Sequence, residues 1–269
     1  MYRLRTVWVY AVGLFLTAFW SVRILAHNLV RSRALARVVE RAPRAWSSGI
    51  LKAAGVRVRY EGLDGLPRDQ AQILVANHES WFDVFALAAT LPVDYRFVGK
   101  KELSEIPVFG PAWLAAGHYA IDRSDRQAAI ASLDRVGSRM REGRHTVVLF
   151  PEGTRSKDGT MGAFKKGAFV MAINAGVPIV PVAILGSRRI MPKGSWSVRG
   201  GEILVRVGRP IPTEGYAVDR RGALTTVARE AIEALKTGNA LPDQRADEGV
   251  LSGGLGDARR TTDATWRAS

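Results

Sequence analysis

The sequence predicts an α/β fold in which a mixed, mostly buried sheet of about seven strands is flanked by helices and preceded by an N-terminal membrane-associating helical segment. From residue 56 onward, short β-branched runs alternate with helical patterns, which is typical of strands covered by helices. The fractions of hydrophobic residues (47%) and charged residues (24%) are those of a folded globular protein. A chain of 269 residues is long enough to bury a substantial core.

The elements follow from local patterns. Residues 127–142 place Ile130, Leu133, Val136 and Met140 at helical spacings, with Gly143 as the stop signal. Further helices are expected at 81–91, at 164–175 and from about 219 to 236. Strands are expected at 56–60, 72–76, 95–98, 118–121, 146–150, 178–184 and 203–207.

The N-terminal segment, residues 1–45, is interpreted as a membrane anchor. Residues 6–22 form an uncharged run of 17 residues, which as a helix spans roughly 25 Å, at the short edge of what crosses a bilayer. Its aromatic residues surround the helix instead of forming one stripe, which argues against a buried core helix. A signal peptide is a competing interpretation, but no small-residue cleavage site precedes the arginine-rich segment. The pattern leaves open whether this helix spans the bilayer or dips into one leaflet.

Residues 33–44 form a second, basic helical pattern. Leu35, Val38, Val39 and Ala42 cluster on one side of a helical wheel, and four arginines cluster on the other. We expect this helix to lie on an anionic membrane surface with its apolar face down. A solvated basic helix on a soluble domain is the alternative.

The charge is +14 and unevenly placed, with eight Arg and one Glu in residues 1–45. Such a balance favours an anionic partner. If the first helix spans the membrane, the excess of arginine after it places the rest of the chain on the cytoplasmic side. The absence of cysteine excludes a disulfide scaffold, a thiol nucleophile and a thiolate metal site. Residues 46–237 are expected to form the main folded domain, and residues 238–269 a disordered tail.

A polar cluster, Asn77-His78-Glu79-Ser80-Trp81-Phe82-Asp83, follows the strand at 72–76 directly. Polar residues at the carboxyl end of a buried strand are a usual place for a site in an open α/β sheet. His78 and Asp83 meet only if His78 lies in the loop before the helix and Asp83 in its first turns. The carboxylate then holds one ring nitrogen and leaves the other free as a base. A structural histidine is the alternative interpretation. Ser80 lacks the Gly-x-Ser-x-Gly elbow of a nucleophile, and a simple helix cap is the alternative interpretation for it.

A second cluster, Phe150-Pro151-Glu152-Gly153-Thr154-Arg155-Ser156, follows the strand at 146–150. A glycine turn offers backbone N–H groups, Thr154 a hydroxyl and Arg155 a planar fork, all suited to phosphate. Further cations, at 100–101 and 165–166, also follow or precede predicted elements. The three basic clusters would converge on one anion, although an ordinary turn with a surface arginine is the alternative.

Four ordered motifs resemble the glycerolipid acyltransferase family over roughly residues 50–212. NHESWFD at 77–83 matches its NHxxxxD motif, and FPEGTRS at 150–156 matches its third motif letter for letter. FVGKKELSEIPVFG at 97–110 and VPIVPVAI at 177–184 are similar to its second and fourth motifs. The most similar subgroup is the bacterial 1-acyl-sn-glycerol-3-phosphate (lysophosphatidic acid) acyltransferases, which implies a place at the bacterial inner membrane.

The resemblance implies transfer of an acyl group from acyl-CoA or acyl-carrier protein to the free sn-2 hydroxyl of a lysophospholipid, giving phosphatidic acid. His78 would be the general base and Asp83 its orienter. Arg155 with Gly153 and Thr154 would hold the phosphate of the acceptor, Lys101 would be a second phosphate ligand, and Glu152 would order the loop. A thioester is already activated, so no covalent intermediate, cofactor or metal is expected.

Alternatives stay open at this point. A related acyltransferase acting on another lysolipid, such as lyso-ornithine lipid, would share the same motifs. A basic nucleic-acid-binding protein would use the +14 charge, but the sequence carries no RRM, KH or zinc-finger signature, so anionic membrane lipids and not nucleic acids are the expected partners. A non-catalytic membrane scaffold is disfavoured by the intact His78 and Asp83.

Overall fold

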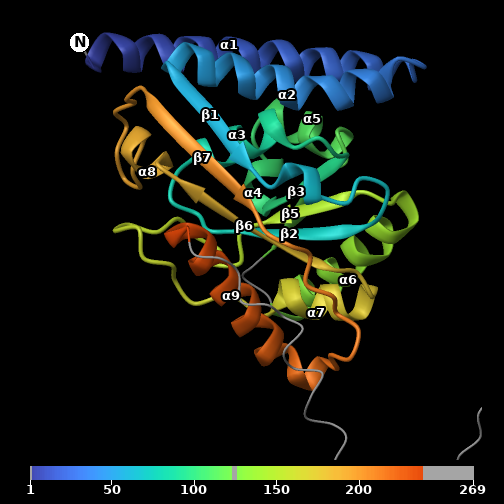
Figure 1. Cartoon of the computed structure of the whole chain (residues 1–269). Helices are drawn as coiled ribbons and strands as arrows, with labels where there is room; N and C mark the ends of the chain where they lie inside the picture. Colours follow the sequence, from blue (N-terminus) through green and yellow to red (C-terminus); the bar gives the residue numbers. More distant parts are fainter. Residues whose placement is uncertain (1, 123–125, 239–269) are drawn as a thin grey trace, which may run out of the picture.

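The computed structural model describes residues 2–122 and 126–238, and it confirms the predicted mixed α/β class (Figure 1). In the described residues, seven strands form one sheet in the order β1-β7-β6-β2-β5-β3-β4. Their neighbours pair in parallel, except that β6 and β7 are antiparallel. The strands are β1 (Val56–Glu61), β2 (Gln72–Ala76), β3 (Tyr95–Lys100), β4 (Tyr119–Ile121), β5 (Thr146–Leu149), β6 (Ile179–Leu185) and β7 (Gly201–Val207).

Helices cover both faces of the sheet. One face packs on α2 (Leu35–Ala54), α3 (Phe82–Thr90) and α8 (Ser187–Ile190), and the other on α6 (Arg126–Gly143), α7 (Gly167–Ala175) and α9 (Arg221–Thr237). The central strand β2 is buried along its whole length. A strand buried on both faces reads as the continuous apolar run found at 72–76.

The predicted elements match these bounds to within a few residues. The sequence did not predict five short elements: η1 (Leu63–Gly65), α4 (Lys101–Ser104), α5 (Phe109–Ala115), α8 and η2 (Val218–Arg220). These are helical segments of three to seven residues, about two turns or fewer, which is too short to show a helical period. The tail predicted at 238–269 lies outside the described residues except for Gly238.

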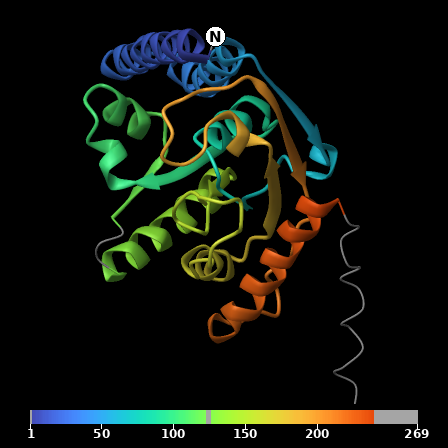
Figure 2. The ribbon, with the colours of Figure 1, turned by 90° about the vertical axis from the view of Figure 1, so that its left-hand side faces the viewer.

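The N-terminal segment forms two long helices, α1 (Tyr2–Leu29) and α2, which pack side by side along one end of the molecule (Figures 1 and 2). Arg23 does not interrupt α1. α2 runs through Pro43 without a break and continues past the predicted boundary at residue 45. It ends at Gly55, which has the left-handed conformation. The first two helices are therefore joined continuously to β1.

The expected placement of the basic helix on a membrane surface is wrong for its apolar face. Val38 and Ala42 are buried, and they pack with Ile24 of α1 and Ala112 of α5 inside the molecule. Arg44 also turns inward, where its guanidinium donates to the carbonyl of Val93 at 2.9 Å. An amphipathic stripe indicates that a helix lies at an apolar boundary, and here that boundary is the protein itself.

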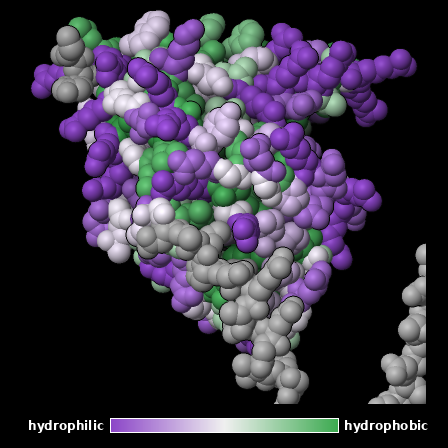
Figure 3. Space-filling view, viewed as in Figure 1, coloured by the Kyte–Doolittle hydropathy of each residue, from purple (hydrophilic) through white to green (hydrophobic). Residues whose placement is uncertain are grey.

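By contrast, α1 keeps large apolar side chains on its outer surface. Leu14 and Phe15 are 74% and 66% exposed, and Leu4, Val7 and Trp8 are also exposed. Figure 3 shows hydrophobic side chains along this end of the molecule, among charged ones. Within the described residues, one helical stretch, Arg3–Leu29, is long and apolar enough to cross a membrane, and 17% of its most apolar part is buried.

Candidate active site

The two predicted polar clusters lie next to each other because the strands before them are neighbours. β2 and β5 pair in parallel, with Val75 opposite Leu149. The carboxyl ends of parallel neighbours meet at one edge of a sheet. The two loops are also bonded directly, because the backbone N–H of Ser156 donates to the carbonyl oxygen of His78 at 2.7 Å.

The predicted contact between His78 and Asp83 is confirmed. His78 lies in the loop before α3, Asp83 lies in the first turn of that helix, and Nδ1 of His78 is 2.8 Å from Oδ2 of Asp83. The carboxylate is fully buried, whereas the imidazole is 15% exposed. Because the ionised carboxylate can only accept, Nδ1 carries the proton, and Nε2 is left with a lone pair.

The same carboxylate oxygen fixes the loop. Oδ2 of Asp83 also accepts hydrogen bonds from the backbone N–H groups of Glu79 (2.7 Å) and Ser80 (2.8 Å). The ring of His78 stacks on Phe150, with centroids 4.0 Å apart and an interplanar angle of 15°. Orientation of the imidazole is therefore set from two sides, by a carboxylate in one loop and an aromatic ring in the other.

The loop between β2 and α3, residues 77–81, is called the histidine loop below. Asn77 and Ser80 anchor it near its two ends. Asn77 donates to the carbonyl of Ile184 at 2.8 Å and accepts from its N–H at 2.7 Å, so its amide stands in for a strand partner. The hydroxyl of Ser80 donates to Met191 and accepts from the N–H of Phe82. The N-cap of α3 is Trp81, without a side-chain cap, so Ser80 bonds the first N–H of the helix from the preceding loop and is not its N-cap.

Glu152 links the two loops through its carboxylate. Oε1 accepts from the backbone N–H of His78 and Oε2 from that of Gly162, each at 2.9 Å. Gly153 follows with a φ of +72°, where a side chain would be strained, and a Cβ there would come within 2.9 Å of the side chain of Lys165. The turn is therefore ordered by a buried carboxylate and requires glycine.

Arg155 points toward the histidine loop. Its guanidinium lies 5.2 Å from the centroid of the Trp81 ring, a cation–π arrangement. Partial burial lowers the pKa of Arg155, and the Asp83 carboxylate opposes that shift. An arginine remains charged at neutral pH in either case, so this loop presents a fixed cation close to the base. Thr154, its predicted companion, is exposed.

Lys101 lies beside Gly153 of the second cluster, and its role as a phosphate ligand stays a prediction. It lines a cavity of 390 Å³ together with Gly153 and Lys165, but Arg155 is not part of that lining. The ammonium of Lys101 is 3.3 Å from the carboxylate of Asp122 and is more than half exposed. The structure thus brings Lys101, Lys165 and Gly153 to one cavity and leaves Arg155 over Trp81, so the expected convergence of three basic clusters on one anion is only partly seen.

Comparisons with known proteins identify the family. Residues 57–185 match the family model described as Acyltransferase. The crystal structure of the 1-acyl-sn-glycerophosphate (LPA) acyltransferase PlsC from Thermotoga maritima superposes with a TM-score of 0.73, at 26% identity over 87% of this chain and 96% of that one. Residues 57–185 therefore form an acyltransferase-family domain.

Curated relatives in the acyltransferase family carry matching names. The chain is 39% identical over 153 residues to the 1-acyl-sn-glycerol-3-phosphate acyltransferase BAT2 of Brassica napus, covering 56% of this chain and 44% of that protein. It is 34% identical over 178 residues to the human 1-acyl-sn-glycerol-3-phosphate acyltransferase alpha, covering 66% of this chain and 63% of that protein. The chain spans about half the length of the first curated relatives it matches.

Two lysines at this candidate site were not predicted. Lys193 donates to the hydroxyl of Thr154 at 2.9 Å and to the carbonyl of Arg155 at 2.8 Å. Lys236 of α9 reaches Glu79. Both lie far along the chain from their partners, and a single lysine without a motif gives no signal in the sequence. Among the residues described here, no group of three or more His, Cys, Asp or Glu side chains could hold a metal ion.

Proposed function

We propose that this chain transfers a fatty acyl group from an acyl thioester to the sn-2 hydroxyl of 1-acyl-sn-glycerol-3-phosphate, giving phosphatidic acid. The observation that carries the proposal is the His78–Asp83 pair at 2.8 Å, with Nε2 left as a base. The names of the curated relatives and of the structural neighbour supply the substrate.

In the proposed reaction, Nε2 of His78 takes the proton of the acceptor hydroxyl as its oxygen attacks the thioester carbonyl. The carbonyl π bond opens to a tetrahedral oxyanion, which a backbone N–H of the Glu152-Gly153-Thr154 turn would stabilise. The carbon–sulfur bond then breaks, and the leaving thiolate takes the proton from the imidazolium, which restores the neutral base. Asp83 keeps the ring in the productive tautomer throughout, and no acyl-enzyme, cofactor or metal takes part.

The acceptor phosphate is assigned to Arg155 and the Gly153–Thr154 turn, with Lys101 as a second ligand. Arg155 supports this assignment most directly, because its guanidinium is half-buried over the ring of Trp81, three residues after the proposed base. Lys101 must exchange Asp122 for the phosphate, so its contribution is expected to be the weaker one. An apolar cavity of 810 Å³, lined in part by Phe150, Pro151 and Gly153, opens beside the same turn and offers space for the apolar part of a substrate.

An acyl-transfer assay tests the proposal. Purified protein in vesicles should convert 1-acyl-sn-glycerol-3-phosphate to phosphatidic acid with acyl-CoA, acyl-carrier protein or both as donor. Lyso-ornithine lipid serves as the competing acceptor in parallel reactions. Product from lyso-ornithine lipid alone would reassign the acceptor, and no ester product from either acceptor would overturn the proposal.

We further propose that α1 and α2 attach the catalytic domain to a membrane surface. The exposed apolar side chains of α1 support attachment, and the packing of α1 along basic α2 favours insertion into one leaflet over a full span. The natural end of this unit is Gly55, so cutting at residue 45 would break α2 and expose its buried face.

Point variants test membrane attachment without cutting α2. Leu14→Glu combined with Phe15→Glu should shift most of the protein from floating vesicles to the soluble fraction, because burying either charge in lipid costs several kcal/mol, about 2.5 or more per charge. Tyr60→Glu, an exposed apolar site on edge strand β1, is the matched control and should still float. Equal flotation of both variants would contradict attachment through α1.

A further inference from the structure

Glu79, directly after the proposed base, is a buried carboxylate that the proposed chemistry does not use. The residue is 8% exposed. Its Oε1 accepts a hydrogen bond from Nδ2 of Asn77 at 3.2 Å, and its backbone N–H donates to Asp83. Glu79 thus sits inside the loop that holds His78, and its carboxylate bonds Asn77, whose amide in turn bonds Ile184 of β6.

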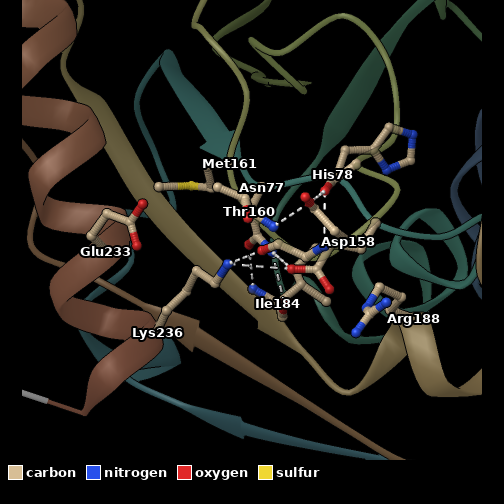
Figure 4. A network of polar contacts seen from close by, with 12 residues as sticks. Asn77, His78, Asp158, Thr160, Met161, Ile184, Arg188, Glu233 and Lys236 are labelled. Atoms are coloured by element: carbon tan, nitrogen blue, oxygen red, sulfur yellow. Dashed lines mark hydrogen bonds and ion pairs between the residues drawn. The ribbon is translucent and has the colours of Figure 1, made fainter.

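Lys236, in the last turn of α9, meets this carboxylate from the other end of the chain. Its ammonium lies 3.3 Å from Oε1 of Glu79 and 2.9 Å from the carbonyl oxygen of Gly159, to which it donates. Both side chains of the ion pair are largely buried, at 19% and 10% exposed. Figure 4 shows Lys236 reaching from α9 into the network around Asn77 and Ile184, on the side away from the His78 ring.

These contacts join the two loops of the site at one cation. Glu79 belongs to the histidine loop, and Gly159 belongs to the segment that continues from Arg155. We propose that Lys236 is a positioning residue: it neutralises Glu79 and holds the two loops together, so that helix α9 is part of the catalytic scaffold. The inference rests on the proposed acyl transfer for its kinetic readout, but the contact itself does not.

The charges around Glu79 give the contact its weight. Burial raises the pKa of Glu79, and the Asp83 carboxylate raises it further, whereas Lys236 lowers it. Arg188 of α8 is a second cation near Glu79. Both border Gly159, because a Cβ added there would lie 3.4 Å from Nε of Arg188 and 3.8 Å from Oε2 of Glu79. Without Lys236, an ionised Glu79 would add a poorly compensated negative charge beside the His78–Asp83 pair, and negative charge favours the protonated imidazole.

Kinetics of Lys236→Met test the proposal. We expect kcat to fall roughly tenfold to a hundredfold, because small displacements of catalytic groups cost about that much, with the acceptor KM nearly unchanged. The acid limb of the kcat/KM profile should move to higher pH. Lys236→Arg should retain more activity than Lys236→Met, and Lys236→Met with Glu79→Gln should recover the wild-type pH profile and part of kcat. Arg57→Met, which removes an exposed cation on edge strand β1, is the control.

A measurement that needs no activity separates this inference from the proposed function. A carboxyl whose pKa is raised on folding contributes stability below its unfolded value and loses it as pH rises through the folded value. The melting temperature of Lys236→Met should therefore fall further below wild type as pH rises from the ordinary glutamate value of 4.5 toward 8. The double variant should show no such widening.

Two results would overturn the positioning role. One is an unchanged kcat and pH profile in a folded Lys236→Met protein. The other is equal loss in the single and double variants with a pH-independent difference in melting temperature, which would reduce Lys236 to a packing contact. Absence of acyl transfer by the wild type would instead remove the proposed function, and the melting experiment would still decide whether Lys236 compensates Glu79.

Discussion

The two loops at the carboxyl ends of β2 and β5 are built differently. In the histidine loop, Asp83 is fully buried and Asn77 and Ser80 are nearly so, and each has hydrogen-bond partners supplied by the protein. In the loop after β5 (residues 150–156, called the arginine loop below), Glu152 is buried, whereas Thr154 is exposed and Arg155 half-exposed. The histidine loop takes most of its partners from the protein, with Oδ1 of Asp83 left unpaired, and the arginine loop still offers polar groups to a ligand.

The difference matches two tasks. A general base must be held in one orientation, because a lone pair pointing elsewhere cannot take the proton. A group that binds phosphate must instead stay available to the ligand and give up few internal hydrogen bonds when the ligand arrives. Glu152 is the exception in the arginine loop, since it accepts a hydrogen bond from the N–H of His78. It thereby links the arginine loop, which is open to a ligand, to the closed histidine loop.

Removing the base is expected to have the largest effect. His78→Ala should lower kcat by about 10²–10⁴-fold, the usual contribution of a positioned acid or base. The fold should persist, because the loop is still held by Asp83, Asn77 and Glu152. Initial rates with saturating substrates, together with a melting curve, measure both.

His145→Gln is the matched control for that variant. His145 is a buried histidine, paired with the hydroxyl of Tyr119 at 2.9 Å and not with the proposed site. It should keep near-wild-type kcat. Near-wild-type turnover in folded His78→Ala would remove His78 from the mechanism and leave the rigid loop without its proposed task.

Prediction from sequence succeeded where a contact is local or set by strand order. His78 and Asp83 are five residues apart across a loop–helix junction, so few geometries bring them together, and the structure has the one predicted. The neighbouring positions of the two loops follow from parallel strands. Side-chain direction is not set by strand order, which is why Lys101 turns to Asp122 and Arg155 to Trp81.

Two other features show where a pattern is ambiguous. The apolar stripe of α2 predicted a boundary but not its nature, since a stripe that includes Val38 and Ala42 suits lipid and protein equally. Lys193 and Lys236 come from segments 38 and 157 residues away from partners they bond. Such contacts depend on how α9 and the segment after α8 dock, which no local period encodes.

Changing the shape of the cation in the open loop is expected to have an intermediate effect. A guanidinium makes two parallel hydrogen bonds to a phosphate, whereas an ammonium acts as a point charge. Arg155→Lys should therefore lower kcat/KM for the phosphorylated acceptor by roughly tenfold to a hundredfold, the loss of one charge-assisted bond of about 1.5–3 kcal/mol. Most of the change should be in the acceptor KM, measured with the donor saturating.

The donor provides the internal control for Arg155→Lys. Its KM should change much less than that of the acceptor. An increase in donor KM with an unchanged acceptor KM would place Arg155 on the CoA or carrier-protein side, and the open loop would then be a donor site.

The smallest effect concerns Trp81, where the two loops touch through a side chain that belongs to the closed one. Its ring lies 5.2 Å from the guanidinium carbon of Arg155 and is 42% exposed, so it restrains the arginine without burying it. An exposed cation–π contact contributes about 0.5–1 kcal/mol. Trp81→Leu should therefore lower acceptor kcat/KM only about two- to fivefold, because Arg155 loses preorganisation but keeps its fork. Trp81→Phe, which keeps an aromatic face, should lose less.

In a double-mutant cycle, adding Trp81→Leu to Arg155→Lys should cost less than it does in the wild type, since the ring acts through the arginine. Equal losses in both backgrounds would show that Trp81 contacts the substrate itself, and the restraint of the open loop by the closed one would have to be sought at Glu152 alone.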